Sequence, residues 1–355
     1  MIDGTASAEI RRAAEETMRV FQVPGLVVVA TRGGQPLAQL FLGGDAAGHA
    51  VAPDSIFPVA SVTKLATALA VLRLVDAGTL ALDDALASVL PDAAAAQTGV
   101  TTRTLLCHDS GLPLDPRGET SLYAPGLTWP TLAQACLQTS LRWPPGSRVQ
   151  YSNVGYGLLA VVVERLVGQA FPTALRSLVL DPLGIEGYLG SEPPRAPMVI
   201  ADVRGPHADT PLAPFNAAFW RSLALPWAGL LTSVAGALGL LRAYQGLPVD
   251  FLELETLADA TRNQTDDLGG GYAPPLVWPR CPWGLGPELR DQKTPHWAPA
   301  QAGPDSFGHA GASGCVAWSD PSTVVDWAIL GTRTADNGWL VRRGPALGAA
   351  ILAAG

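Results

Sequence analysis

Residues 61–78 read SVTKLATALAVLRLVDAG, an apolar run that opens with a serine and closes with a glycine. Apolar residues recur through the run and a glycine suits the end of a helix, so the sequence predicts a buried helix from Ser61 to Ala77. Residues three positions apart share one face of a helix. We therefore expect the amine of Lys64 to reach the hydroxyl of Ser61.

The Ser61–Lys64 pair indicates a nucleophile and its base. The first turn of a helix has free backbone N–H groups and the positive end of the helix dipole, and both favour a developing negative charge. Apolar surroundings lower the pKa of a lysine and make its neutral amine available as a base. A helix cap followed by a surface lysine is the alternative. Only two of the 23 basic residues are lysines, Lys64 and Lys293, and an arginine cannot lose its proton, so the catalytic interpretation is favoured.

Tyr151-Ser152-Asn153 is a second candidate, placed between a Pro-Pro-Gly loop and an apolar helix. A phenol near a lysine can lose its proton more easily and relay it, and an asparagine amide can orient both a base and a substrate carbonyl. Ordinary helix capping by Ser152 or Asn153, with Tyr151 as a packing residue, is the alternative.

His309-Ala310-Gly311-Ala312 is a third candidate and leads into an expected strand. Small residues there allow a backbone to approach a substrate closely. We expect a backbone N–H from this edge to join that of Ser61 in an oxyanion hole; a glycine-rich turn before a strand is the alternative. The adjacent His108 and Asp109 do not predict a catalytic triad, because neighbouring side chains point apart and a turn explains their sequence.

The rest of the chain predicts helices and hairpins at both ends. The expected elements are a helix over 8–21, strands over 26–31 and 36–42, a helix over 229–245, an irregular segment over 262–306, strands over 314–319 and 323–331, and a helix over 340–353. The two hairpins can share one antiparallel sheet with the terminal helices packed on it. The expected fold is α/β (α+β), with a discontinuous sheet domain (1–78 and 227–355), a mostly helical domain (79–226) and the active site in the cleft between them.

Composition narrows the classes of partner. The formal charge is −8 without a basic run, which argues against nucleic-acid binding. No apolar stretch approaches the roughly 20 residues of a membrane span. The four cysteines are scattered, so we expect free thiols and neither a disulfide framework nor a metal site. The first residues lack a signal-peptide pattern, so a cytoplasmic location is expected, although a removed signal would leave the same sequence. The oligomeric state stays open.

Taken in order, Ser-x-x-Lys, Tyr-Ser-Asn and His-x-Gly resemble the motifs of the serine β-lactamase and penicillin-binding-protein-like superfamily. The resemblance is greatest to class C β-lactamases and family VIII carboxylesterases. It spans roughly residues 10–335, and three ordered motifs are far more specific than any one of them. Supporting similarities lie at 105–113, 145–159, 181–184, 228–233 and 283–286.

The resemblance implies an acyl-enzyme mechanism. Ser61 would attack a carbonyl, while Lys64 and Tyr151 take and return protons. Asn153 would help to hold this network, and the backbone N–H groups of Ser61 and Ala312 would stabilise the oxyanion. His309 and Gly311 would support the site or bind substrate. No cofactor is implied.

Two features depart from the family pattern. Its third motif is usually Lys-Thr-Gly, whose lysine helps to bind a substrate carboxylate, and His309 stands there instead. A histidine is not a fixed cation, which weakens the case for anionic β-lactam substrates at neutral pH. Lys293-Thr294 is followed by Pro295, which would disrupt a central strand, so we expect a loop there. Asp109 stands where the family often has threonine.

These observations favour a serine hydrolase, and among hydrolases a carboxylesterase that acts on small apolar esters or lactones. A β-lactamase or a D-amino-acid amidase or peptidase is the first alternative, which would make a small amide the substrate. A catalytically silent relative that binds a ligand in the same cleft is the second.

Overall fold

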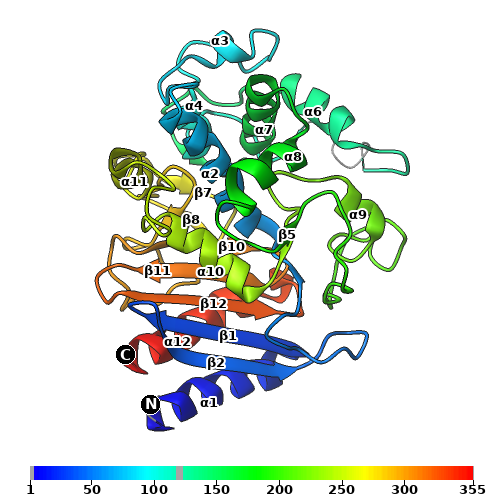
Figure 1. The fold of residues 1–355 in the computed structure, drawn as a ribbon, viewed down its shortest axis with the longest axis vertical. Helices are drawn as coiled ribbons and strands as arrows, with labels where there is room; N and C mark the ends of the chain where they lie inside the picture. The colour runs from blue at the N-terminus through cyan, green and yellow to red at the C-terminus, as the bar shows by residue number, and fades with distance from the viewer. Residues whose placement is uncertain (1–3, 117–122, 355) are drawn as a thin grey trace.

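A six-stranded antiparallel sheet forms one layer of the computed structural model, which describes residues 4–116 and 123–354 (Figure 1). Its strand order is β2-β1-β12-β11-β10-β9. The strands are β1 (Gly25–Arg32), β2 (Gln35–Gly43), β9 (Glu288–Leu289), β10 (Phe307–Gly311), β11 (Cys315–Asp320) and β12 (Val325–Gly331).

The hairpins from the two ends of the chain meet at the centre of this sheet. β1 pairs with β12, with Leu26 opposite Gly331 and Arg32 opposite Val325. β1 also pairs with β2, and β12 with β11. The predicted α/β fold, in which both hairpins share one antiparallel sheet, is therefore confirmed.

Different helices cover the two faces of the sheet. Successive residues of a strand point to opposite faces, so Val28 packs in one core with the terminal helices and Val27 packs in the other. The terminal helices are α1 (Gly4–Phe21) and α12 (Trp339–Ala354), which contact each other. The opposite face is covered by α2 (Thr63–Asp76) and α10 (Val234–Ala243).

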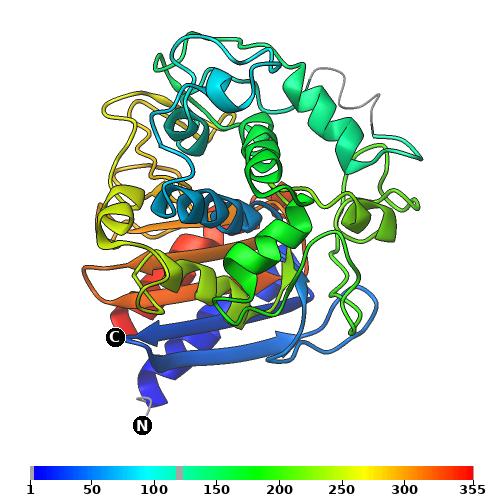
Figure 2. The same ribbon diagram turned by 45° about the horizontal axis from the view of Figure 1, so that its top comes forward.

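The predicted apolar helix is α2, and its start differs slightly from the prediction. Residues Ala60–Val62 form a 3-10 turn, η1, and the α-helix begins at Thr63. Figures 1 and 2 both place α2 between the sheet and the remaining helices. Nearly all of its side chains are buried, including that of Lys64. Ser61 therefore lies in a tight turn that leads into the helix, and not in the helix itself.

The remaining helices stack mostly beyond α2, away from the sheet (Figure 2). They are α3 (Leu86–Val89), α4 (Thr102–Leu106), α6 (Trp129–Leu137), α7 (Asn153–Val167), α8 (Phe171–Leu175), the π-helix η2 (Arg176–Leu180), α9 (Ala218–Ser222), α11 (Leu254–Ala260) and the 3-10 turn η3 (Ala335–Asn337). Two small sheets are formed by β3 (Phe57–Pro58), β6 (Leu231–Thr232) and β5 (Gly187–Tyr188), and by β4 (Val149–Gln150), β7 (Gly270–Gly271) and β8 (Val277–Trp278). The domain boundaries at 78/79 and 226/227 stay a prediction.

The predicted helix over 229–245 was too long at its start. Residues Leu231–Thr232 form β6, which pairs with both β3 and β5. Ser233 then caps α10, since its side chain accepts a hydrogen bond from the backbone N–H of Gly236. A cap residue marks where the helix begins, whereas the pairing of a two-residue strand depends on partners distant in the sequence.

Among the described helices, no single one has the length and apolar composition needed to cross a membrane. One bent pair, α7 with α8 and η2, meets that test only when its two parts are taken together, and they are inclined by 81°.

Candidate active site

Ser61 lies where the η1 turn leads into α2. The preceding residue, Ala60, has a φ of 45°, in the left-handed region. Such a φ is uncommon for a residue other than glycine and is often found at functional sites. The turn leaves Ser61 partly exposed, facing two cavities, so its hydroxyl is accessible to a substrate.

The Lys64 amine is fully buried beside this turn. It donates hydrogen bonds to Asn153 Oδ1 at 2.8 Å and to the Trp227 carbonyl oxygen at 3.1 Å, and it lies 4.5 Å from the centre of the Tyr151 ring. Burial lowers the pKa of Lys64 well below its ordinary value, and the negative charge of Asp115 partly opposes this effect. A neutral amine has two N–H donors and one lone pair. The two acceptors found here match the donors, and the lone pair stays available to take a proton.

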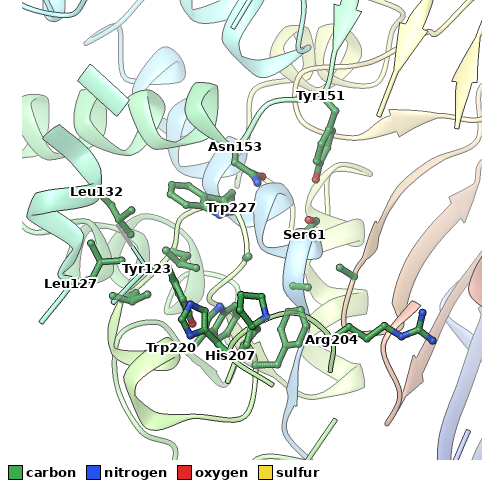
Figure 3. Close-up of a pocket in the computed structure, with 18 residues that line it drawn as sticks. Ser61, Tyr123, Leu127, Leu132, Tyr151, Asn153, Arg204, His207, Trp220 and Trp227 are labelled. Carbon is green, nitrogen blue, oxygen red and sulfur yellow. The ribbon is translucent and has the colours of Figure 1, made fainter. Parts of the chain in front are cut away.

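Tyr151 completes the group, with its hydroxyl directed at the Ser61 hydroxyl (Figure 3). Burial raises the pKa of Tyr151, the nearby Ser61 hydroxyl lowers it, and the charges of Glu288 and Asp115 raise it further. The net direction is upward, so the phenol is protonated at neutral pH. Burial is the largest of these effects in the resting site, and the expected relay of a proton through Tyr151 stays a prediction.

Asn153 is held by a residue that the sequence did not single out. Its Nδ2 donates to Asp115 Oδ1 at 2.7 Å. A carboxylate only accepts hydrogen bonds, so the amide nitrogen must face Asp115 and the amide oxygen must face Lys64. Asp115 lies in a loop 38 residues before Asn153, and no local pattern links the two.

The end of β10 packs directly against the nucleophile turn. A Cβ added at Gly311 would lie 2.3 Å from the carbonyl oxygen of Val59, so only glycine allows this approach. The next residue, Ala312, lines the same two cavities as Ser61. Among the described residues, no hydrogen-bond partner is found for the backbone N–H of either Ser61 or Ala312. Two free N–H donors beside a nucleophile can stabilise an oxyanion.

His309 presents a neutral ring and not a cation. Its Nδ1 lies 2.7 Å from the Ala310 carbonyl oxygen, which can only accept, so Nδ1 carries the proton. Burial, followed by the charge of Lys64, lowers the pKa of His309 to about 4. At neutral pH its Nε2 therefore has a lone pair, and that atom is buried without a partner among the described residues.

His108 packs on Tyr151 and takes no part in a triad-like arrangement. Its ring centre lies 4.6 Å from that of Tyr151, and its Nδ1 accepts a hydrogen bond of 3.1 Å from the backbone N–H of Ser152. Asp109 is contacted instead by the Cys107 thiol, at 3.2 Å. These contacts indicate that His108 supports the position of Tyr151.

A buried charged cluster behind Tyr151 was also missed. Tyr272 stacks on Tyr151 with ring centres 4.3 Å apart and donates to Glu288 Oε2 at 2.9 Å. Glu288 Oε1 accepts from the amine of Lys293 at 2.9 Å, and His296 lies 3.4 Å from the same oxygen. Lys293 does lie in an irregular segment, as predicted, but it is buried. Its rarity as a lysine was the one signal in the sequence.

Two cavities meet at the nucleophile. The first, of about 430 Å³, is shown in Figure 3, and the second has a volume of about 600 Å³. Ser61, Tyr151 and Ala312 line both. A bound carbonyl at Ser61 can therefore extend a substituent into each cavity.

A model of the beta-lactamase family matches residues 10–352. The chain belongs to the beta-lactamase family. Members of this family are serine hydrolases, and the predicted resemblance to β-lactamases and penicillin-binding proteins is confirmed.

Individual relatives in the beta-lactamase family differ in name and activity. The chain is 36% identical over 180 residues to penicillin-binding protein 4 of Amycolatopsis lactamdurans, covering 42% of this chain and 45% of that protein. It is 32% identical over 214 residues to esterase EstB of Burkholderia gladioli, covering 53% of each. The chain thus spans about half the length of the curated relatives it matches. A β-lactamase structure from Mycobacterium bovis aligns with a TM-score of 0.67 at 26% identity, covering 96% of this chain and 98% of that one.

Proposed function

We propose that this protein is a carboxylesterase that works through an acyl-enzyme formed on Ser61. The observation that carries this proposal is the neutral His309, buried beside Tyr151 where related β-lactam-processing enzymes are expected to have a lysine. A site without that cation loses an attraction for a substrate carboxylate, whereas an uncharged ester needs none. The match to esterase EstB supports the same class.

Acylation begins with attack of the Ser61 oxygen on the ester carbonyl. The hydroxyl proton passes to the neutral Lys64 amine, directly or through the Tyr151 hydroxyl that faces Ser61. The negative charge that forms on the carbonyl oxygen is held by the backbone N–H groups of Ser61 and Ala312. Tyr151 donates its proton to the departing alcohol and takes a proton back from the Lys64 ammonium, and the same groups then activate a water molecule that releases the acid.

Hydrolysis of an amide bond, as in a β-lactam or a D-amino-acid derivative, is a second candidate. It is favoured by the match to a penicillin-binding protein, which is 36% identical over 180 residues. Both candidates use the same acyl-enzyme, so they differ in the leaving group and not in the roles of Ser61, Lys64 and Tyr151.

The test combines a substrate panel with trapping of the intermediate. Hydrolysis rates are measured for p-nitrophenyl acetate and butyrate, nitrocefin and D-alanyl p-nitroanilide, and intact mass reports the acyl-enzyme. We expect the esters to react fastest and the acyl mass to disappear in Ser61→Ala. Ser88→Ala is the control, because Ser88 is exposed and bonds only to a nearby carbonyl. Faster turnover of nitrocefin or the anilide would favour the second candidate, and acylation that persists in Ser61→Ala would refute both.

A further inference from the structure

The first cavity has walls made largely of aromatic rings, and we call it the ring-lined cavity. Besides the groups at the nucleophile, its walls include the following apolar and aromatic side chains: Tyr123, Leu127, Leu132, Phe215, Trp220 and Trp227. Figure 3 shows several of these rings gathered on the side of Ser61 that faces Asn153. A volume of about 430 Å³ lies within the range of pockets for small organic ligands.

The rings are held in place by contacts with one another. Phe215 and Trp220 meet edge to face, with centres 5.1 Å apart. Trp227 meets Trp129 in the same way at 6.1 Å. The backbone carbonyl of Trp227 is also the acceptor for Lys64. One wall of the cavity is therefore part of the framework that positions the base.

Phe215 reaches this wall through an unfavourable backbone conformation. Its φ is 65°, in the left-handed region. A bulky residue at positive φ is an outlier, and such strain persists where the surrounding structure enforces it, often at binding sites. Glycine would adopt this φ without strain. Because the backbone strain at Phe215 is retained in spite of this alternative, it indicates that the phenyl ring has a function in the wall of the cavity.

The described part of the cavity lining carries little charge. Among the described residues that line it, Arg204 carries the one permanent charge. Its guanidinium pairs with Asp202 at 2.9 Å and extends away from the other labelled side chains (Figure 3). No carboxylate occurs among those described lining residues. An ammonium group placed between the rings would gain cation–π contacts but would meet no carboxylate among the described lining residues, and such contacts offset only part of the hydration that a charge loses on burial.

We propose that the ring-lined cavity selects esters with a neutral aromatic substituent on one side of the scissile carbonyl. This inference rests on the proposed function and sharpens it. The predicted preference for small esters is replaced by one for aryl esters, because an edge-to-face cage favours a ring over an alkyl chain of similar reach. The substituent can belong to the acid or to the alcohol, and the two arms of the test below separate these cases.

The test compares pairs of esters by proton release in a pH-stat. Methyl phenylacetate against methyl butanoate probes the acid side, and benzyl acetate against propyl acetate probes the alcohol side. We expect kcat/KM to be roughly tenfold or more higher for the aryl member of one pair. Methyl 4-(aminomethyl)phenylacetate and 4-(aminomethyl)benzyl acetate put an ammonium on the same ring, and each should lose the advantage of its parent.

Phe215→Gly removes the ring and relieves the strained φ. We expect the ratio of kcat/KM for the aryl ester to that for its alkyl partner, which we call the aryl advantage, to fall severalfold while the alkyl esters are still hydrolysed. Ala224→Gly is the matched control: Ala224 also has a positive φ, of 51°, but does not line the cavity, so the aryl advantage should stay at the wild-type level.

Three results would overturn the proposal: equal rates within both ester pairs, an aryl advantage that survives Phe215→Gly, or an undiminished rate for the ammonium-bearing rings. Each can occur while simple esters are still hydrolysed through Ser61, in which case the proposed function stands and only the aryl preference fails. Absence of both ester hydrolysis and Ser61 acylation would instead remove the proposed function, and this inference with it.

Discussion

Replacing Asp115 with asparagine should shift the acid limb of the pH dependence of kcat/KM to lower pH. Asparagine keeps an oxygen that can accept the hydrogen bond from Asn153, so the bridge to Lys64 is retained while the negative charge is lost. That charge raises the pKa values of Lys64 and Tyr151. Without it, the base loses its proton at a lower pH, so activity on the acid side should rise.

The size of the shift follows from the geometry of the bridge. Hydrogen bonds of 2.8 Å and 2.7 Å flank the Asn153 amide. The charges of Lys64 and Asp115 are therefore at most about 8 Å apart, which gives roughly 0.5 kcal/mol in water and about 2 kcal/mol at an effective dielectric constant of 20. At about 1.4 kcal/mol per pH unit, the acid limb should move by roughly 0.4 to 1.5 units.

The assay is kcat/KM for one uncharged ester between pH 4 and 9, at constant ionic strength. Asp92→Asn is the matched control, because it removes the same charge from an exposed carboxylate that pairs with Arg165, and its profile should coincide with that of the wild type. An acid limb that stays in place in folded Asp115→Asn, or that moves to higher pH, would refute the link between Asp115 and the base.

Three further changes have distinct expected outcomes. Lys64→Arg should reduce kcat by roughly 10²–10⁴, because a guanidinium cannot accept the proton; stopped-flow acylation measures this, and an active variant would rule out Lys64 as the base. Gly311→Ala should lower kcat by about 10²–10³ with a smaller effect on KM, since the new Cβ would collide with the Val59 carbonyl and displace the oxyanion donor; wild-type kinetics would argue against that donor. Glu288→Gln should lower the free energy of unfolding by about 3–5 kcal/mol, and adding Lys293→Met should recover much of the loss; urea titration checks both, and a double variant less stable than the single one would contradict the pairing.

The parts of the site found from the sequence are those with a local signature. Ser61 and Lys64 are three residues apart, and Tyr151 and Asn153 are two apart, so each pair could be recognised from a short stretch of sequence. The shared sheet was also predictable, since the strands of the two hairpins are rich in apolar residues that must be buried. The structure brings these groups together at one point between the sheet and the helices.

The parts that escaped prediction depend on tertiary contacts. Asp115 is one carboxylate in a loop, and its role appears only when Asn153 lies against it. Glu288 and Lys293 are close in sequence, but nothing local indicates that both charges are buried. The prediction placed the two residues of β6 in a helix, because they form a strand only through pairing with β3 and β5.

The two lysines of this chain are both withdrawn from solvent, with exposures of 0% for Lys64 and 2% for Lys293. Reagents that acylate primary amines should therefore find no lysine on the native surface, however many arginines it displays. Lysine modification would begin only when the chain opens. A mass-spectrometric count of acylated lysines would thus report unfolding directly, and coupling to a solid support through lysine would immobilise denatured molecules in preference to native ones.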